Sequence, residues 1–399
     1  MIVNIPVAFY ASILLYLAHS DAIINNGPLS SAVMIILYSL PIVASVFSWI
    51  SDLPRRFKLS TLYDSDGNSI RSTTFNPSHR YLPFLPDPLF TPEVTYDTIH
   101  QYLMEKQQEN ANTGNNHAAK ASWALVTGAS KGIGRAIAIS LARRNIPLVL
   151  VARDFEKLKA LSQLIQECYG VKTLVIKCDI GSSKDIDTMM EVLEKNCIDI
   201  DILVNNAGLG DTCEFVNMSP EKMDQLNHVN VMGTTKLTKF VGAAMMQKRR
   251  GRILFVSSLT GSMPGIPTAA MYAATKCYQR SLSSSLGREL EGYGVGVTCA
   301  MPGAVTETGF QRDANMMHST IFKFPFGILT PEMVAESSVA AMILGRQECF
   351  IGWMNVVMGK LCSKLFSARL MILICELSFR PLPFKDIFAT KSPEEKKFK

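Results

Sequence analysis

The chain has 399 residues, of which 48% are hydrophobic and only 19% are charged. These proportions exclude an intrinsically disordered or collagen-like protein, because such chains are poor in apolar residues or repeat glycine at every third position. The net charge of +6 is too small to indicate nucleic-acid binding by itself. The nine cysteines form no CxxC pair, which favours free thiols in a reducing compartment over a disulfide framework or a metal site.

Much of the apolar excess lies in residues 1–51, which predict a membrane anchor. Residues 32–50 are an uncharged apolar run, long enough to cross about 30 Å of hydrocarbon as a helix. A basic cluster at residues 55–58 follows, so the positive-inside rule places the rest of the chain in the cytosol. The shorter run at residues 2–18 leaves three alternatives open: two spans, one span after a cleaved or interfacial segment, and a buried hairpin.

Residues 52–120 predict a linker, since residues 105–120 are polar and rich in Asn and Gln. From residue 121 short apolar runs alternate with segments of helical periodicity. Strands are expected at 123–126, 148–152, 173–177, 200–204 and 253–256, and helices at 135–144, 155–168, 185–194 and 272–291. This alternation is typical of an α/β domain, in which helices cover both faces of a parallel sheet and ligands bind at the carboxyl ends of the strands.

A glycine-rich turn, TGASKGIG at residues 127–134, joins the first strand to the first helix. This order directs a helix N-terminus at a phosphate group. Gly128 permits a tight turn, Gly132 lets the backbone approach a pyrophosphate, and Gly134 allows close packing of helix on strand. The spacing G-x-x-x-G-x-G differs from the G-x-G-x-x-G of the dinucleotide fold.

Arg153 stands at the end of the second expected strand, where an NAD enzyme places an acidic residue for the ribose 2′-hydroxyl. A guanidinium suits a 2′-phosphate instead, and Lys131 in the glycine turn adds a second positive charge. Asp154 is expected to cap the following helix through Glu156. The sequence therefore predicts NADP(H), with a solvated surface charge as the alternative role of Arg153.

Tyr272 and Lys276 are spaced by four residues and share one helix face, fourteen residues after the strand-end Ser258. A phenol with a pKa near 10 is a poor acid or base at neutral pH. A nearby ammonium and a positive nicotinamide both favour the phenolate, so they are expected to bring the Tyr272 pKa toward a useful range. Ser258 would hold the substrate oxygen while Tyr272 transfers a proton.

TGASKGIG, NNAG at residues 205–208, Ser258 and YAATK at residues 272–276 occur in this order. Together they resemble the short-chain dehydrogenase/reductase family over residues 122–345. The resemblance implies a Rossmann, doubly wound, seven-stranded parallel sheet, a domain over residues 121–345, and a homodimer formed through its long helices.

The resemblance also implies residue roles. Tyr272 is the general acid/base, Ser258 orients the carbonyl, Lys276 binds the nicotinamide ribose and lowers the Tyr272 pKa, and Asn230 kinks a helix and holds a relay water. The cofactor positions that it implies are Thr127, Gly128, Ser130, Lys131, Gly132, Ile133, Gly134, Arg153, Asp179, Ile180, Asn206, Ala207, Gly208, Tyr272, Lys276, Pro302, Gly303 and Val305.

Two departures from the family pattern leave alternatives open. The Ser258–Tyr272 spacing is one residue longer than usual, so Ser257 is a second candidate for the substrate serine. Glu307 occupies the position at which the family has a threonine, so either Thr306 or Thr308 could meet the cofactor.

Two C-terminal regions favour a lipophilic substrate. Residues 309–329 are rich in Met and Phe, which suit such a ligand, although core packing is an alternative. Residues 346–385 are apolar with Lys360, Lys364 and Arg369 expected on one helix face, which predicts a membrane-interfacial helix, a substrate cap or a dimer contact. The basic tail at 386–399 ends in lysines that resemble the dilysine signal of the endoplasmic reticulum.

The sequence thus predicts a membrane-anchored, NADP(H)-dependent oxidoreductase that interconverts a lipophilic ketone and its secondary alcohol. Candidate substrates are a 3-ketoacyl thioester, a ketosteroid, a ketosphingoid base and a retinoid. Membrane lipid and a second copy of the chain are the expected partners, with no metal and no nucleic acid. A non-catalytic NADP-binding scaffold or redox sensor is the alternative, and a sugar-nucleotide epimerase is less favoured because its glycine turn differs.

Overall fold

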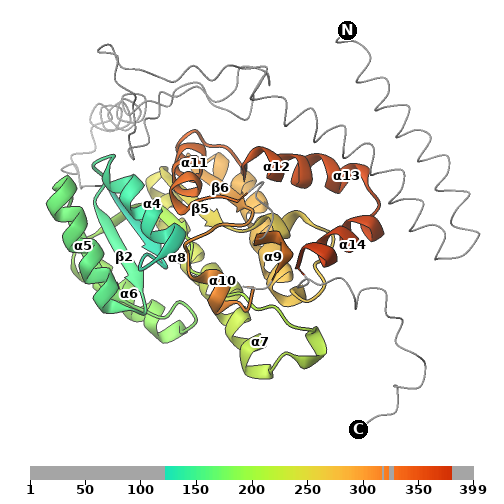
Figure 1. The fold of residues 1–399 in the computed structure, drawn as a ribbon. Helices are drawn as coiled ribbons and strands as arrows, with labels where there is room; N and C mark the ends of the chain where they lie inside the picture. The colour runs from blue at the N-terminus through green and yellow to red at the C-terminus, as the bar shows by residue number, and fades with distance from the viewer. Residues whose placement is uncertain (1–121, 317–318, 323–327, 380–399) are drawn as a thin grey trace, which may run out of the picture. The chain divides into compact units, whose positions relative to one another are not determined.

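A computed structural model describes residues 122–316, 319–322 and 328–379 (Figure 1). The expected membrane anchor at residues 1–51, the linker at 52–120 and the basic tail at 386–399 lie outside the described residues. Within the described part, no helix combines the length and the apolar character that a membrane crossing requires.

Seven parallel strands form one sheet in the order β3-β2-β1-β4-β5-β6-β7. The strands are β1 (Ser122–Thr127), β2 (Leu148–Ala152), β3 (Thr173–Lys177), β4 (Asp199–Asn205), β5 (Gly251–Val256), β6 (Val295–Pro302) and β7 (Glu348–Ile351). The order reverses direction between β1 and β4, which is the point at which doubly wound sheets bind ligands. The predicted fold, a doubly wound seven-stranded parallel sheet, is confirmed.

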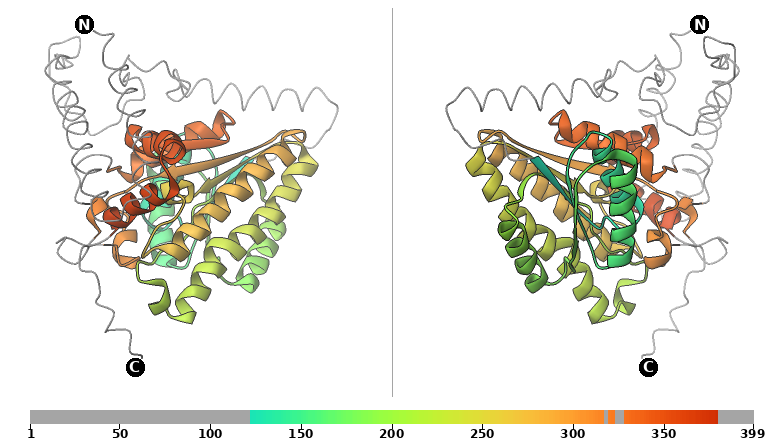
Figure 2. Two further views of the ribbon diagram at one scale, coloured as in Figure 1. Left: turned by 90° about the vertical axis from the view of Figure 1, so that its right-hand side faces the viewer. Right: turned by 90° about the vertical axis from the view of Figure 1, so that its left-hand side faces the viewer.

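Helices cover both faces of the sheet (Figure 2). One layer holds α4 (Gly132–Ala142), α5 (Phe155–Tyr169) and α11 (Pro331–Ile343), and the other holds α6 (Ser183–Lys195), α8 (Thr234–Lys248) and α9 (Ala270–Glu291). Successive strand residues alternate between the two cores: Val126 packs with the first layer and Leu125 with the second. Both faces are apolar, so the strands are continuous hydrophobic runs.

The C-terminal segment differs from its expected form. A helical stretch formed by α12 (Trp353–Val356), a π-helical turn (Val357–Cys362) and α13 (Ser363–Leu365) ends where Phe366 adopts an extended backbone, and α14 (Ala368–Phe379) follows. Lys360 and Arg369 therefore belong to different helices. The prediction of a single basic helix face is wrong, because the chain breaks the helix between them.

Candidate active site

A cavity of about 500 Å³ opens where the strands end. Its nucleotide half is formed by the glycine-rich turn, the end of β2 and the segment after β4, and every predicted cofactor position except Thr127 lines the cavity. Its substrate half is formed by residues 258–266, by α10 (Phe310–Asp313) with the segment after it, and by α14. The two halves meet at Tyr272.

Thr127 supports the nucleotide half from below the surface. It is buried, and its hydroxyl donates a hydrogen bond to the Val204 carbonyl at 3.0 Å. The same oxygen accepts hydrogen bonds from the backbone N–H groups of Asn206 and Ala207, each at 3.0 Å. Thr127 thus fixes the position of the NNAG segment beside the glycine turn.

The glycine turn leaves no space for a side chain at Gly132 or Gly134. A Cβ atom on Gly134 would lie 2.3 Å from both the Gly128 carbonyl oxygen and Asn206 Nδ2, and one on Gly132 (φ +56°) would lie 3.0 Å from Thr308 Cβ. Lys131 is the N-cap of α4 and makes no side-chain capping hydrogen bond, so the helix N-terminus directs free backbone N–H groups at the cavity. This cradle fits a pyrophosphate.

Both predicted phosphate-binding cations lie at the nucleotide half. Arg153 lines the cavity, with 65% of its side chain exposed, and its guanidinium is 3.8 Å from the Asp179 carboxylate. Lys131 pairs with Asp313 on α10 and holds the pKa of that carboxyl below its usual range. Asp154 caps α5 as predicted, but through the backbone N–H of Lys157 at 3.2 Å, not of Glu156.

Ser258, Tyr272 and Lys276 are brought together as predicted, each less than 10% exposed. Ser258 lies close enough to Tyr272 to lower the pKa of its phenol, and Ser258 Oγ accepts a hydrogen bond from the backbone N–H of Thr260 at 3.2 Å. The hydroxyl of Ser257, the other candidate, donates a hydrogen bond to the backbone carbonyl of Lys276 at 2.9 Å. Ser258 is therefore the serine beside the tyrosine.

Burial dominates the protonation of the two titratable groups. It raises the pKa of Tyr272 to about 12, against a smaller lowering by the hydrogen bond from Ser258. Burial outweighs the lowering expected from the Lys276 ammonium, which is 5.9 Å from the ring centroid and points at the Val256 carbonyl, 2.9 Å away. Burial also lowers the pKa of Lys276 to about 8. Around neutral pH the tyrosine is a neutral proton donor and the lysine is charged.

Asn230 lies in a π-helical turn (His228–Gly233) that interrupts the helix before α8, in agreement with the predicted kink. Its side chain exchanges two hydrogen bonds of 2.8 Å with the backbone of Leu209. The backbone carbonyl of Asn230 accepts a 2.9 Å hydrogen bond from the Gln279 side chain. The side-chain oxygen of Gln279 in turn accepts a hydrogen bond from Lys276. Gln279 is not among the predicted site residues, although its position three residues after Lys276 on one helix places it on the same face.

The two candidate threonines point to different places. Thr308 lines the cavity beside Gly132 and is buried, whereas Thr306 makes both backbone and side-chain hydrogen bonds to the Leu329 carbonyl. Thr308 is thus the threonine available to a ligand in the nucleotide half.

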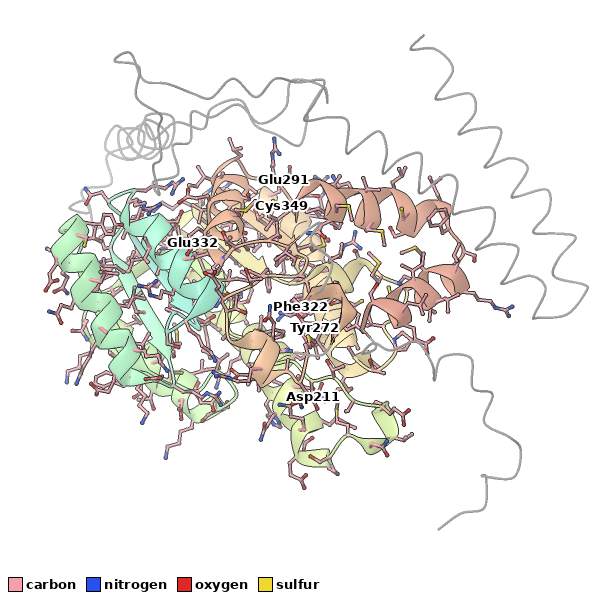
Figure 3. All side chains as sticks on the ribbon, in the orientation of Figure 1. Asp211, Tyr272, Glu291, Phe322, Glu332 and Cys349 are labelled. Atoms are coloured by element: carbon pink, nitrogen blue, oxygen red, sulfur yellow. The ribbon has the colours of Figure 1, made fainter. Side chains whose placement is uncertain are left out.

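The substrate half is apolar. The Tyr272 ring packs against Phe310 with 5.6 Å between centroids, and Phe322 packs against the same cluster (Figure 3). The described residues of the predicted loop at 309–329 therefore contribute to the cavity. The remaining walls come from Met263 and Ile266 and from residues of the C-terminal segment, namely Met358, Ile374, Cys375, Ser378 and Phe379.

Comparisons with known proteins agree with this geometry. The family described as short chain dehydrogenase matches residues 122–318. The very-long-chain 3-oxoacyl-CoA reductase of Anas platyrhynchos is 33% identical over 243 residues, covering 58% of this chain and 74% of that protein. The enzyme of the same name from Aspergillus terreus is 38% identical over 181 residues, covering 45% and 51%. The chain spans about half the length of most of the curated relatives it matches.

Among solved structures, a short-chain dehydrogenase from Sphingobium yanoikuyae in complex with NADPH superposes with a TM-score of 0.53. It is 28% identical in sequence, and the match covers 57% of this chain and 87% of that one. Together with the parallel sheet, the glycine turn and the Ser258–Tyr272–Lys276 array, these similarities show that the chain belongs to the short-chain dehydrogenase family of oxidoreductases.

Proposed function

We propose that the chain is an NADP(H)-dependent reductase that converts the 3-keto group of a long-chain 3-oxoacyl thioester to a secondary alcohol. One observation carries the proposal: the buried array of Ser258, Tyr272 and Lys276 lies where a phosphate-binding cradle and an apolar pocket meet in one cavity. A non-catalytic scaffold would need the cradle alone. The names of the relatives support the choice of substrate.

The choice of NADP(H) rests on charge. The β2 end carries Arg153 where a carboxylate would be needed for a free ribose 2′-hydroxyl, and Lys131 lies in the adjoining turn. Lys131 and Arg153 each pair with an exposed carboxylate. A 2′-phosphate is a doubly charged acceptor and can take the place of either carboxylate. The related dehydrogenase in complex with NADPH is consistent with this choice.

In the proposed mechanism the chain's residues bind the ketone and supply a proton. Ser258 and Tyr272 hold the carbonyl oxygen between their hydroxyls and polarise the bond. A nicotinamide held in the nucleotide half, beside Lys276, would supply the hydride. Tyr272 gives its proton to the developing alkoxide, which is a far stronger base than the phenolate, so a raised Tyr272 pKa keeps the donor protonated at neutral pH. Lys276, which is charged below pH 8 and lines the nucleotide half, would bind the nicotinamide ribose.

The remaining site assignments are part of the proposal. Thr308 would meet the carboxamide end of the cofactor, beside the Pro302–Val305 segment. Asp179 and Ile180 would meet the adenine, and Asn206 to Gly208 would lie against its ribose. The substrate half would bind the acyl chain, because a ligand with many methylene groups gains about 0.8 kcal/mol for each one buried.

We also propose that the protein acts at the membrane of the endoplasmic reticulum, as a homodimer, with its catalytic domain in the cytosol. The apolar run at residues 32–50 and the basic residues that follow it support an anchor. The C-terminal helices support an interfacial role next to the substrate half, since they expose a group of large apolar side chains, namely Val357, Leu361, Leu365, Phe366 and Leu373.

The test incubates the full chain in detergent with NADPH and 3-oxoacyl-CoA thioesters of increasing chain length. The consumption of NADPH is measured by its absorbance. We expect turnover that improves with chain length, and 3-hydroxyacyl thioester as the product. A panel of ketosteroids, ketosphingoid bases and retinoids provides the comparison. Turnover of one of these classes without turnover of 3-oxoacyl thioesters would refute the substrate assignment, and no turnover with any ketone would refute the reductase.

A further inference from the structure

Gln279 is a buried carboxamide on α9 to which the mechanism above gives no task. It is 1% exposed and lies three residues beyond Lys276. Its Oε1 accepts a hydrogen bond from Lys276 Nζ at 2.9 Å, and its Nε2 donates one to the Asn230 carbonyl at 2.9 Å. The side chain therefore joins the ammonium of α9 to the π-helical turn through two direct hydrogen bonds.

This bridge determines where the ammonium points. An ammonium has three donors, and two of them are directed at the Val256 carbonyl and at Gln279. Lys276 Nζ is also close to Gly208, where an added Cβ would lie 3.4 Å away. One N–H thus remains for the nucleotide half of the cavity, which Lys276 lines.

We propose that Gln279 is a positioning residue for Lys276: its carboxamide ties the ammonium to the Asn230 carbonyl and aims it at the nucleotide ribose. The proposal rests on the proposed function, since the ribose is that of the bound nucleotide.

The charge of Lys276 provides a readout that requires no turnover. The titratable groups that face it are Tyr272 on its own helix and Cys299 on β6, while the π-helical turn presents the uncharged Asn230. Burial lowers the pKa of Lys276 from 10.5 to about 8 in the folded protein. Between these two pH values Lys276 binds more protons in the unfolded chain than in the folded one, so its contribution to stability rises with pH from an onset near pH 8. Buried thiols such as Cys178, whose pKa is raised from 9.0 to about 12, have the opposite effect, which begins above pH 9.

The experiment measures chemical unfolding of the nucleotide-free full chain against pH, and NADPH affinity by fluorescence at pH 7. Gln279→Met keeps the side-chain volume but removes both hydrogen bonds, so the onset should move about one pH unit lower and the Kd for NADPH should rise about tenfold. Gln279→Glu retains an acceptor for Lys276 and adds a negative charge, so the onset should move higher and the Kd should stay within about threefold of wild type.

Two controls separate positioning from general damage. Leu286→Ala, on the same helix and away from Lys276, should lower stability at every pH without moving the onset. Lys276→Met should abolish the onset. The proposal would be overturned if the onset moved in the same direction in both Gln279 variants. It would also be overturned if Gln279→Met kept the wild-type onset and the wild-type Kd for NADPH. Failure of the proposed function has a different signature, namely wild-type protein that binds no NADPH.

Discussion

The two halves of the cavity are built differently. The nucleotide half is made of strand ends and a glycine turn, whose positions follow from the order of the sheet. The substrate half is made of short helical turns and of α14, which come from separate stretches between residues 258 and 379 and pack around Tyr272. The first half is rigid scaffold suited to a common cofactor, whereas the second can vary without disturbing the sheet. Substitutions in each half should therefore have separable effects.

The largest effect is expected at Tyr272, where the halves meet. Tyr272→Phe removes the proton donor but keeps the ring that packs on Phe310, so kcat should fall about 10³-fold while NADPH affinity and stability stay near wild type. Stopped-flow turnover and fluorescence titration measure the two quantities. A variant that retained a near-normal rate would exclude Tyr272 as the acid.

A substitution confined to the nucleotide half should weaken cofactor binding for all substrates. Gly134→Ala brings a methyl group within 2.3 Å of the Gly128 carbonyl, so we expect about 1–3 kcal/mol lower stability and about a hundredfold higher Kd for NADPH. Gly292→Ala is the matched control, since a Cβ there would meet nothing within 4 Å. Equal losses in both variants would show that the turn needs no close approach.

Cofactor choice should respond to Arg153. Arg153→Asp replaces the proposed partner of the 2′-phosphate with a group suited to a free 2′-hydroxyl, so the ratio of kcat/KM for NADPH over NADH should fall about thirtyfold. Lys159→Asp, on α5 just beyond Arg153 and outside the cavity lining, should leave the ratio unchanged. If the two variants gave the same ratio, Arg153 would be a surface charge.

The smallest effect is expected in the substrate half. Ile374→Ala removes part of the apolar wall on α14, so the KM for a long-chain 3-oxoacyl thioester should rise about fivefold while that for a short-chain one changes little. Leu373→Ala, its exposed neighbour, is the control. A rise in the NADPH Kd of Ile374→Ala would break the separation between the halves.

The same contrast explains what the sequence could predict. Glycine spacing, strand periodicity and the Tyr272–Lys276 pair are local patterns, and they located the sheet, the glycine turn and the Ser258–Tyr272–Lys276 array. The direction of the Tyr272 pKa was not predictable, because it depends on how deeply the ring is buried and on where Lys276 points. The break at Phe366 and the contact of α14 with the Tyr272 cluster depend on tertiary packing, which a hydrophobic pattern does not encode.

The most direct test of the account is an experimental structure of the full chain with NADP⁺ and a long-chain 3-hydroxyacyl thioester. We predict the 2′-phosphate beside Arg153 and Lys131, the 3-hydroxyl between Ser258 and Tyr272, and the acyl chain along the inner side of α14. An acyl chain bound outside the cavity, or a 3-hydroxyl without contact to Ser258 and Tyr272, would contradict the account.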